Sequence, residues 1–376
     1  MKNRAKDWQR LRKKRWPVLN KVIISGGGTG GHIFPAVAIA NEIKSRYPNV
    51  DILFIGALGR MEMEKVPQAG YQIVGLPIAG IQRKLSLSNF LVPFKLINSI
   101  LKAKSILKKF QPEVVIGVGG YASAAVLFAA SGAGIPCVIQ EQNSYAGLTN
   151  KWLSTRVRKI CVAYSGMERF FPADRIVITG NPVRSEIYKA KTTDKASARQ
   201  ALGFDAAKPL VLVIGGSLGA RTINNSIQGG IETFDKAEVQ VLWQTGKNFT
   251  PDTRGSKMVK AETFIYDMCT AYAAADIVVS RAGAISVSEL CLIGKPSILV
   301  PSPNVSEDHQ TKNAMALVKE GAAVLVKDTD AGSTLVNQVV ELIRNKNEQE
   351  KLSERIAMLA KPDALSEIVN VIETTL

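Results

Sequence analysis

The chain of 376 residues carries 48 Lys plus Arg against 32 Asp plus Glu, a formal net charge of +16. This length exceeds what one hydrophobic core usually supports, so two domains are expected. With 46% hydrophobic and 21% charged residues, the composition excludes a disordered chain and a coiled coil. Four well-separated cysteines fit a reducing compartment better than a disulfide scaffold or a zinc site, and two histidines exclude a His-rich metal centre.

The net positive charge of the chain comes entirely from its first half. Residues 1–184 contain 27 basic and 9 acidic side chains, whereas the remainder contains 21 and 23. Of this excess, +7 falls in residues 1–20, which form a basic N-terminal extension. The two halves are therefore expected to have different partners.

Short, almost continuously apolar segments recur along the chain, each followed by a turn and a helical pattern. In the first half they are KVIIS, DILFIGA, YQIVGLP, EVVIGV, PCVIQ, KICVA and RIVIT. In the second half they are LVLVI, VQVLWQ, ETFIYDM, DIVVS, PSILV and AAVLV. Such strands are typical of parallel sheets that helices cover on both faces, and their alternation with helices indicates βαβ units.

We therefore predict an α/β protein of two doubly wound domains, residues 21–183 and 184–358. A last helix at 359–376 could pack back on the first domain. The uncharged run 114–140 is long enough to cross a bilayer, but its glycines and Pro136 divide it into strand, turn, helix and strand. We expect no transmembrane helix there.

Three glycine-rich turns follow predicted strands, at 25–31, 117–120 and 215–219. Glycine lets backbone amides approach a ligand, and the following helix offers free amides and the positive end of its dipole. One such turn can simply serve tight packing, but three favour diphosphate binding. The first turn also has the G-x-G-x-x-G spacing of a dinucleotide site. In such a site an acidic residue at the carboxyl end of the next strand binds the ribose, but Asp51 precedes its strand. A dinucleotide site is therefore disfavoured.

His32 directly follows the first turn, at the start of a predicted helix. A helix N-terminus disfavours the cationic imidazole, so a neutral His32 could accept a proton from a substrate. A buried histidine that caps the helix is the alternative. The sequence does not decide between them.

Polar side chains also follow later strands. Glu289, little more than one helical turn after Gly283, could bind a ribose diol, or it could simply offset the helix dipole. At the end of the strand PCVIQ, where ligands of open α/β sheets bind, lie Glu141, Gln142 and Asn143.

The polar loop after PSILV has the composition expected for binding sugar hydroxyls, and a solvated loop is the alternative. It offers Asp308, His309, Gln310 and Asn313. The D-x-D at Asp328–Asp330 lies on another turn, so we expect a turn there and not a metal site.

The segment 78–110 mixes apolar and basic residues, which together fit adsorption to an anionic bilayer surface. A buried amphipathic helix with snorkelling lysines is the alternative. The predicted membrane contacts are Arg83, Lys84, Leu85, Phe90, Phe94 and Lys95.

Seven motifs stand in a fixed order: GGGTGGH-x-x-PA, GVGGY, EQN-x-x-x-G-x-x-NK, GNPVR, GGSLGA, SRAGA-x-x-x-SE and DHQ-x-x-NA. Over about residues 21–370 they resemble the MurG family, the N-acetylglucosaminyltransferases of peptidoglycan synthesis. The resemblance implies a glycosyltransferase B fold, in which two Rossmann-like domains with parallel sheets enclose a cleft.

The same resemblance implies inverting transfer of N-acetylglucosamine from UDP-GlcNAc to the 4-hydroxyl of undecaprenyl-diphospho-N-acetylmuramyl-pentapeptide, without metal or cofactor. It further implies peripheral attachment to the cytoplasmic face of the inner membrane through the first domain, and it allows a place in a cell-wall synthesis complex.

Carried over residue by residue, the family's donor contacts fall on Thr29, Gly30, Gly31, Asn143, Arg184, Ser217, Ile265, Ala284, Ile285, Ser286, Val287, Ser288, Glu289 and Gln310. Ser217 would lie at the diphosphate, the Ile265 backbone at uracil and Glu289 at the ribose. The acceptor diphosphate is expected near Gly119, Gly120 and Tyr121. DHQ, where many members have two glutamines, and residues 1–20 depart from the family pattern.

In this interpretation the acceptor hydroxyl attacks the anomeric carbon, with His32 as the candidate base. An alternative is another UDP-sugar enzyme of the same fold, such as a UDP-GlcNAc 2-epimerase, which would not need the segment 78–110. A nucleic-acid-binding module fits the pI of 9.6 but leaves the three glycine turns unexplained, so we expect no nucleic-acid partner.

Overall fold

In the computed structural model, which describes residues 19–78 and 92–376, the chain divides into two compact units. Unit 1 contains the described residues up to 141, with 146–179 and 365–376, and unit 2 contains 142–145 and 180–364. The expected boundaries, at 183/184 and 358/359, thus differ by a few residues from those of the structure. Asn181 donates to the Gln142 carbonyl and to Ser288 Oγ, and Tyr188 donates to the Pro362 carbonyl, which keeps these segments in unit 2.

Unit 1 is built on a seven-stranded sheet with the order β3-β2-β1-β4-β5-β6-β7, in which every pair is parallel. The strands are β1 (Lys21–Ser25), β2 (Asp51–Ala57), β3 (Gln72–Leu76), β4 (Val114–Gly117), β5 (Cys137–Glu141), β6 (Lys159–Val162) and β7 (Ile176–Ile178). Val22 in β1 aligns with Ile52 of β2 and with Val114 of β4, so β1 is hydrogen-bonded along both edges.

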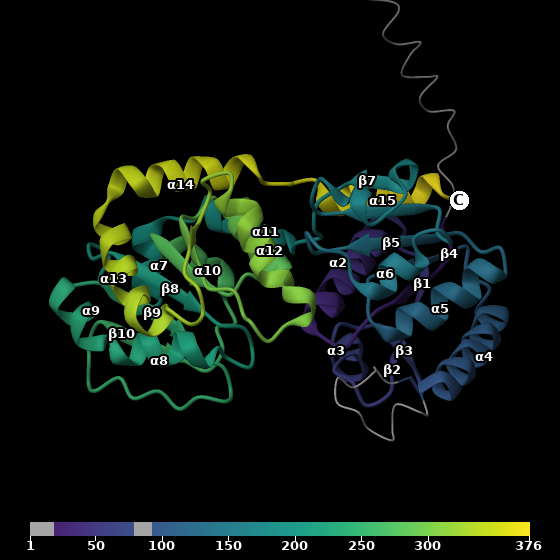
Figure 1. Cartoon of the computed structure of the whole chain (residues 1–376), viewed down its shortest axis with the longest axis horizontal. Coiled ribbons are helices and arrows are strands. Elements are labelled where there is room, and N and C mark those ends of the chain that lie inside the picture. The colour runs from purple at the N-terminus through teal and green to yellow at the C-terminus, as the bar shows by residue number, and fades with distance from the viewer. Residues whose placement is uncertain (1–18, 79–91) are drawn as a thin grey trace, which may run out of the picture. The chain divides into compact units, whose positions relative to one another are not determined.

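Helices cover both faces of this sheet (Figure 1). They are α2 (Gly30–Arg46), α3 (Glu62–Gln68), α4 (Val92–Phe110), α5 (Tyr121–Gly132), α6 (Leu148–Leu153) and α15 (Ala364–Thr374), with short 3-10 turns η2 (Met167–Arg169) and η3 (Ala173–Arg175). Because side chains alternate along a strand, Val22 and Ile24 pack with α2 and α15, whereas Ile23 packs with α4 and α5. Both faces are therefore apolar, as the continuous hydrophobic runs predict.

The last helix, α15, belongs to unit 1. Ile368 and Ile372 are fully buried against β1 and α2. Arg46 at the end of α2 donates to the Ser366 carbonyl at 3.0 Å and to Asn370 Oδ1 at 2.7 Å, and it pairs with Glu373 at 3.1 Å.

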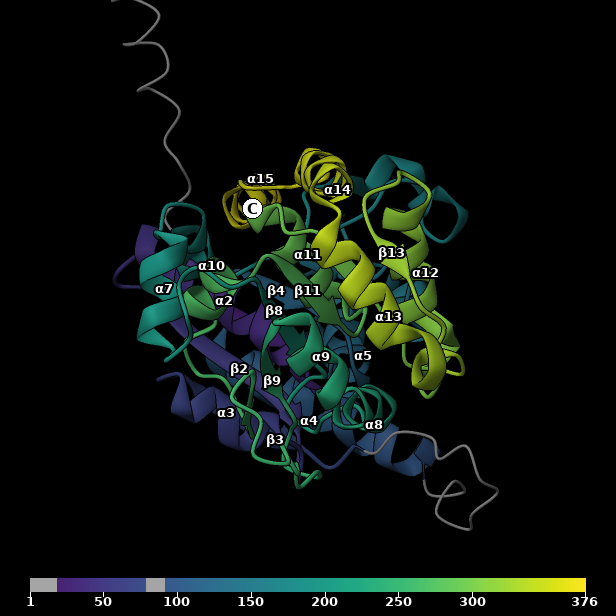
Figure 2. The same cartoon turned by 90° about the vertical axis from the view of Figure 1, so that its left-hand side faces the viewer.

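Unit 2 is built on a six-stranded parallel sheet, β10-β9-β8-β11-β12-β13. The strands are β8 (Leu210–Ile214), β9 (Gln240–Gln244), β10 (Val259–Glu262), β11 (Ile277–Ser280), β12 (Ser297–Leu299) and β13 (Val324–Leu325). The helices are α7 (Lys195–Ala201), α8 (Arg221–Gly229), α9 (Ile231–Ala237), α10 (Met268–Ala274), α11 (Ala284–Ile293), α12 (His309–Val318), α13 (Ala331–Arg344) and α14 (Lys346–Met358), with η4 (Ser185–Lys191) and η5 (Ser306–Asp308). Figure 2 shows α7 and α10 on one side of β8 and β9, and α9 and α13 on the other.

One predicted strand is wrong. ETFIYDM was expected to form a strand, but β10 ends at Glu262 and the chain then loops to α10. Phe264 and Tyr266 are 44% and 89% exposed, and Asp267 caps α10 by accepting from the Thr270 amide at 3.0 Å. The two aromatic residues of this segment therefore lie on a surface loop, and only Ile265 between them is buried.

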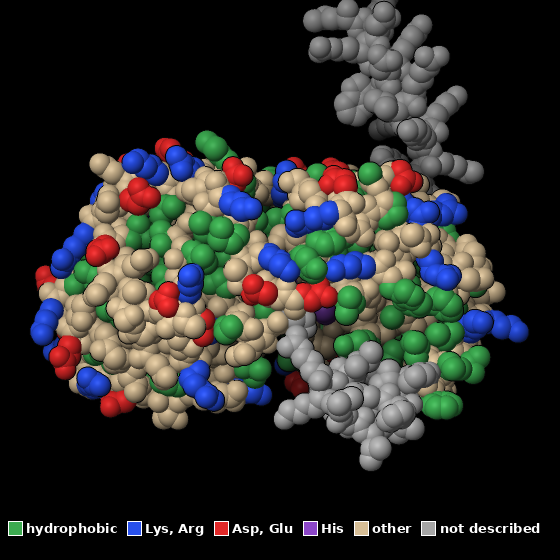
Figure 3. All heavy atoms as spheres, in the orientation of Figure 1, with side chains coloured by type: hydrophobic (Ala, Val, Ile, Leu, Met, Phe, Trp, Pro, Cys, Tyr) green, Lys and Arg blue, Asp and Glu red, His purple; other side chains and the backbone are tan. Residues whose placement is uncertain are grey.

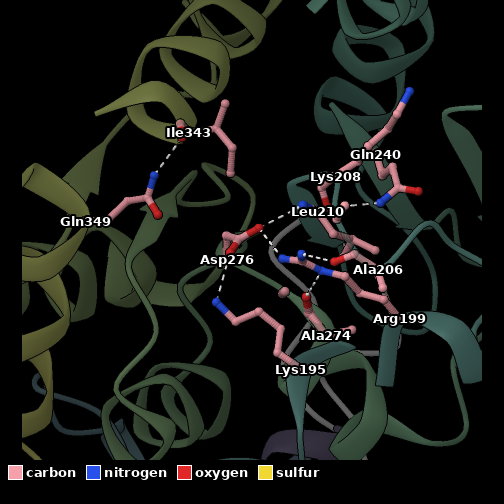
Figure 4. A network of polar contacts seen from close by, with 12 residues as sticks. Lys195, Arg199, Ala206, Lys208, Leu210, Gln240, Ala274, Asp276, Ile343 and Gln349 are labelled. Atoms are coloured by element: carbon pink, nitrogen blue, oxygen red, sulfur yellow. Dashed lines mark hydrogen bonds and ion pairs between the residues drawn. The ribbon is translucent and has the colours of Figure 1, made fainter. Parts of the chain in front are cut away.

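Asp276, at the start of β11, is the centre of a buried ion-pair network in unit 2 (Figure 4). Its carboxylate contacts Arg199 at 2.5 Å, Lys195 at 2.9 Å and the Leu210 amide at 2.8 Å. Burial tends to raise the pKa of Asp276, but the hydrogen bonds from Lys195 and Leu210 and the charges of Lys195 and Arg199 outweigh it and lower that pKa. The network ties α7 to β8 and β11.

We expect Asp276→Asn to lower the free energy of unfolding at pH 7 by about 3 kcal/mol, because it leaves buried Arg199 without its counter-charge. A lowered folded-state pKa contributes stability above the unfolded value of 3.8, and that contribution is lost as the pH falls through the folded value. The difference between variant and wild type should therefore shrink below pH 4 in urea titrations. Glu238→Gln, which breaks an exposed ion pair with Lys208, should change nothing measurable. A deficit that persists at low pH would contradict this account.

Among the described residues, no helix combines the length and the apolar character needed to cross a membrane.

Candidate functional site

The sheet of unit 1 has its topological switch point between β1 and β4. From β1 the chain passes through α2 to β2 on one side, and from β4 it passes through α5 to β5 on the other. The two glycine turns, 26–29 and 118–120, thus leave adjacent strands at the same sheet edge. Open α/β sheets bind ligands at this kind of crevice.

The two glycine turns of unit 1 touch each other. A Cβ added at Gly120, where φ is +90°, would lie 2.6 Å from the Gly27 carbonyl oxygen. A Cβ at Gly26 would lie 2.0 Å from Val118 Cγ2. The glycines therefore let the two turns lie backbone against backbone. Close packing and ligand access both follow from the same residues.

The residues predicted to contact ligand phosphates lie at the starts of the helices that follow these turns. Thr29 is the N-cap of α2, whose first two residues are Gly30 and Gly31. Tyr121, 51% exposed, is the first residue of α5, and Gly119 and Gly120 precede it. The first amides of a helix have no acceptor within it, and its dipole favours an anion. Both helix starts are thus suited to phosphate oxygens.

His32 is half-buried in the first turn of α2, and its Nδ1 lies 2.9 Å from the Gly27 carbonyl oxygen. Because a carbonyl can only accept, Nδ1 carries the proton, and in the neutral imidazole Nε2 is left with its lone pair. Nε2 faces the second glycine turn, since a Cβ at Gly119 would lie 2.9 Å from it. His32 thus binds the glycine turn through Nδ1 and does not cap the helix, whose N-cap is Thr29. Its role as a base stays a prediction.

Glu62, on α3, is a residue that the sequence did not single out. It is 1% exposed, and its carboxylate accepts from the Gly28 amide at 2.9 Å and the Ala57 amide at 3.0 Å. A Cβ at Gly27 would lie 2.2 Å from this carboxylate. A glutamate in the first turn of a helix commonly offsets the dipole, so its position alone gave no signal.

The glycine turn of unit 2, between β8 and α8, packs against the turn after β9. A Cβ at Gly219 would lie 2.1 Å from the Thr245 carbonyl oxygen, and one at Gly246 would lie 2.0 Å from the Gly219 amide. Ser217 is exposed at the top of this turn, and its carbonyl accepts from the Lys247 amide at 3.4 Å.

Gln244, at the end of β9, links the predicted donor contact Ile265 to the glycine turn that carries Ser217. Its Nε2 donates to the Gly216 carbonyl at 3.2 Å, and its Oε1 accepts from the Ile265 amide at 3.0 Å. The Ile265 amide is thus already engaged within the protein. A polar residue that ends an apolar strand at its carboxyl end is the signal that could have identified Gln244.

Glu289 lies on α11 between two partners. It is 6% exposed; Tyr272 donates to its Oε2 at 3.0 Å, and Arg184 Nη2 lies 3.6 Å from Oε1. Burial raises the pKa of Glu289, while the Arg184 charge and the hydrogen bonds from Tyr272 and Arg184 oppose the rise only in part. The structure thus brings two predicted donor contacts, Arg184 and Glu289, into direct contact. Tyr272, which the sequence did not indicate, holds the other oxygen of Glu289.

Asn143 lies beside the start of α11. Asn313, fully buried on α12, donates to Asn143 Oδ1 and to the Ala282 carbonyl, each at 3.2 Å, and accepts from the Ser144 amide at 2.9 Å. Ala284 to Glu289 form the first six residues of α11. Asn313, predicted as a sugar contact on a loop, thus instead fixes Asn143 beside this helix.

The expected polar loop at 308–313 is largely helical, because α12 begins at His309. Gln310 accepts from the Ser302 amide at 2.9 Å and so holds the turn after β12. At the D-x-D, Asp328 pairs with Arg281 and accepts from Thr222 Oγ1 at 2.9 Å. Among the residues described, no group of three or more His, Cys, Asp or Glu is arranged to hold a metal ion.

Four of the predicted membrane contacts, Arg83, Lys84, Leu85 and Phe90, lie outside the described residues. The other two lie in the first turn of α4, where Phe94 is 72% exposed and Lys95 half-buried.

Comparison with known proteins agrees with this geometry. Residues 22–162 match the glycosyltransferase family 28 N-terminal domain, and residues 210–368 match the glycosyltransferase family 28 C-terminal domain. The chain thus has two Rossmann-like units with glycine turns at the carboxyl ends of their strands, and each unit matches a glycosyltransferase domain. Together these findings identify a glycosyltransferase.

Two curated relatives match nearly the whole chain. The chain is 56% identical over 352 residues to a protein of Cytophaga hutchinsonii, covering 93% of this chain and 95% of that one. It is 54% identical over 360 residues to one of Porphyromonas gingivalis, covering 94% of each. Both are named UDP-N-acetylglucosamine–N-acetylmuramyl-(pentapeptide) pyrophosphoryl-undecaprenol N-acetylglucosamine transferase. The chain belongs to this family, the MurG family of glycosyltransferases.

Two solved structures have a similar fold over nearly the whole chain. The crystal structure of Acinetobacter baumannii MurG matches with a TM-score of 0.76 and 27% identity, covering 94% of this chain and 99% of that one. UDP-GlcNAc 2-epimerase from Neisseria meningitidis shares the fold, with a TM-score of 0.64 and 17% identity, covering 94% and 99%. The fold alone therefore does not separate transferase from epimerase.

Proposed function

We propose that this enzyme transfers N-acetylglucosamine from UDP-GlcNAc to the 4-hydroxyl of undecaprenyl-diphospho-N-acetylmuramyl-pentapeptide, a step of peptidoglycan synthesis that supports cell shape and division. The observation that carries the proposal is 56% identity over 93% of the chain to a transferase named for these two substrates. The paired glycine turns at the switch point of unit 1 support it, because a diphosphate-bearing acceptor needs an anion site apart from that of the nucleotide.

The donor binds through unit 2 in this proposal. Uracil contacts the backbone at Ile265, the ribose contacts Glu289, and the diphosphate lies at Ser217 and the N-terminus of α8. Free amides and the helix dipole there stabilise the charge that develops on the leaving UDP. Arg184 and residues 284–288 complete the nucleotide contacts, and Asn143 and Gln310 contact the donor sugar and phosphates. Thr29 to Gly31, which belong to unit 1, are further donor contacts that the family resemblance implies.

The acceptor binds through unit 1, with its diphosphate at Gly119, Gly120 and Tyr121. His32 Nε2 takes the proton of the 4-hydroxyl as its oxygen forms a bond to the anomeric carbon. The bond from that carbon to the diphosphate oxygen breaks, and UDP leaves with inversion. The Nδ1–H contact with the Gly27 carbonyl supports this role, because it leaves Nε2 as the acceptor.

Glu289→Gln is expected to weaken donor binding without lowering the stability of the fold. We expect the KM for UDP-GlcNAc to rise about 10- to 100-fold, because a charged acceptor for the ribose is replaced by a neutral one. Since the folded pKa of Glu289 is raised, its ionisation costs stability as the pH rises through that pKa. The variant should thus match wild type below pH 4.5 and equal or exceed it at pH 7 in urea titrations. A large stability loss at pH 7 would contradict this.

The enzyme attaches, in our proposal, to the cytoplasmic face of the inner membrane through unit 1. Exposed Phe94, Ile97 and Leu101 recur on one face of α4, and Leu148 and Trp152 are exposed on α6. Figure 3 shows hydrophobic side chains gathered on this face of unit 1. Exposed lysines on α4 and Arg156, stacked on Phe128 at 4.6 Å, supply the positive charge that anionic lipid attracts.

A double variant, Phe94→Ser with Leu101→Ser, tests this attachment. We expect its partition onto vesicles of phosphatidylglycerol and phosphatidylcholine to fall roughly 100- to 10,000-fold, because each of the two side chains loses on the order of 1.5–3 kcal/mol of burial and about 1.4 kcal/mol corresponds to a factor of ten. Met358→Ser, which removes an 81% exposed side chain of α14, is the control and should bind as wild type does. Equal binding of the double variant in a flotation assay would disprove the surface.

The function itself is tested by measuring UDP release with and without the lipid-linked acceptor. Release that depends on the acceptor supports the transferase. Formation of a 2-epimer of the sugar without acceptor would instead support an epimerase.

A further inference from the structure

One peptide group in the first glycine turn is hydrogen-bonded at both ends. Its carbonyl, from Gly27, accepts from His32 Nδ1 at 2.9 Å, and its N–H, from Gly28, donates to Glu62 Oε2 at 2.9 Å. Glu62, the Gly27–Gly28 peptide and His32 therefore form one continuous hydrogen-bond chain. A carboxylate at the end of such a chain polarises the peptide and makes its carbonyl a stronger acceptor.

The position of Glu62 is tightly defined. Its other oxygen accepts from the Ala57 amide at 3.0 Å, which fixes the carboxylate to the end of β2. Gly27 and Gly56 leave the space that it fills, since a Cβ on either would lie 2.2 or 2.5 Å from its side chain. A fully buried carboxylate with two backbone donors cannot turn away without losing both.

The other buried carboxylates described in unit 1 have different tasks. Glu141 accepts from the Gly147 amide at 3.0 Å and from Asn150 at 2.8 Å. Glu373 binds Arg46 and Tyr47 at the far end of α2. Glu141 is therefore a matched comparison, being equally buried and bound to a glycine amide in another turn.

We propose that Glu62 is a positioning residue for His32: through the Gly27–Gly28 peptide, its carboxylate holds the imidazole as the tautomer protonated on Nδ1, with Nε2 as the acceptor. The arrangement has the logic of a carboxylate that orients a catalytic histidine, with a peptide group inserted between them. The proposal rests on the proposed function only in so far as Nε2 receives the proton of the acceptor hydroxyl.

Nitrogen NMR of the full chain, labelled with 15N in its histidines, tests the tautomer directly. The chain has two histidines, so a His309→Gln sample assigns both signals. In wild type under conditions where His32 is neutral, we expect a protonated Nδ1 and an unprotonated Nε2. An Nε2-protonated His32 would overturn the proposal. This spectrum needs neither substrate nor variant, so it does not depend on the transferase function.

Glu62→Gln tests the carboxylate. A glutamine can accept from only one of the two amides and turns its NH2 toward the other, so the chain to His32 is weakened. We expect the Nδ1–H form to give way to a mixture of tautomers, whereas Glu141→Gln leaves it unchanged. If Glu62→Gln does not fold, Glu62→Asp takes its place, because its carboxylate is too short to reach both the Gly28 and the Ala57 amides. An unchanged tautomer in a folded Glu62 variant would overturn the proposal.

Kinetics then distinguish positioning from general support of the fold. Glu62→Gln should lower the single-turnover rate about tenfold in the wild-type background and less than about twofold in the His32→Ala background, because the two residues act as a unit. Equal factors in both backgrounds would show that Glu62 does not act through His32.

Discussion

Replacing His32 by alanine is expected to lower the single-turnover rate of N-acetylglucosamine transfer by about 100- to 10,000-fold, the range that a general base contributes. The reason is geometric, because the Gly27 carbonyl fixes the proton on Nδ1 and leaves Nε2 as the acceptor beside the second glycine turn. Binding of UDP, measured by calorimetry, should not change. Rapid-quench assays with saturating donor and lipid acceptor measure the rate without product release.

His32→Asn is the matched control for this prediction. Its amide can still donate to the Gly27 carbonyl and so preserve the turn, but it offers no base. We expect it to be nearly as slow as His32→Ala. Transfer at the wild-type rate by either variant would show that His32 only holds the glycine turn and is not the base.

Gly120→Ala is expected to reduce transfer by at least about 100-fold, because an added Cβ would lie 2.6 Å from the Gly27 carbonyl oxygen and push the two glycine turns apart. A displacement of about 1 Å in a positioned reaction costs a factor of this size. The effect should appear in the KM for the lipid acceptor as well as in kcat.

Gly134→Ala separates this clash from backbone strain. Gly134 also has a positive φ, of +77°, but an added Cβ there would meet nothing within 4 Å. Both variants place alanine at a positive φ and so lose stability, and the backbone cost is larger at Gly120, whose φ of 90° and ψ of 166° lie in a region essentially confined to glycine. Only Gly120→Ala should lose transfer, and equal transfer rates in the two variants would contradict the role of the paired turns.

Much of the fold could be predicted because its signals are local. Apolar strands such as VVIG at 114–117 are buried on both faces of a parallel sheet, and nothing but the local sequence was needed to locate them. The segment ETFIYDM failed because its aromatic residues are exposed in a loop, and aromatic content alone does not distinguish a surface loop from a buried strand.

The site was predictable where backbone shape matters and less so where side chains meet across the fold. Glycine-rich turns indicate that a backbone is closely approached, and in unit 1 the Gly120 and Gly27 backbones approach each other. The glycines do not indicate which side chain packs against the turn. Glu62 and Tyr272 lie on helices, where a glutamate or an aromatic residue is common, so neither residue stood out in the sequence. Asn313 shows the converse, since its polarity suggested a ligand, whereas its buried amide makes hydrogen bonds to three residues of the protein, Asn143, Ser144 and Ala282.

The distribution of charge along the chain fits the roles that we propose for the two units. The nearly neutral second half forms most of unit 2, which we propose binds the soluble donor, and the basic first half forms unit 1, which we propose meets an anionic membrane and a diphosphate lipid.

The most direct test of the central claim is UDP release by the purified enzyme with UDP-GlcNAc and undecaprenyl-diphospho-N-acetylmuramyl-pentapeptide in anionic vesicles. We predict release that requires the acceptor and matches, mole for mole, the disaccharide formed on the lipid. Release at the same rate without acceptor, or sugar chemistry with no disaccharide product, would contradict the account.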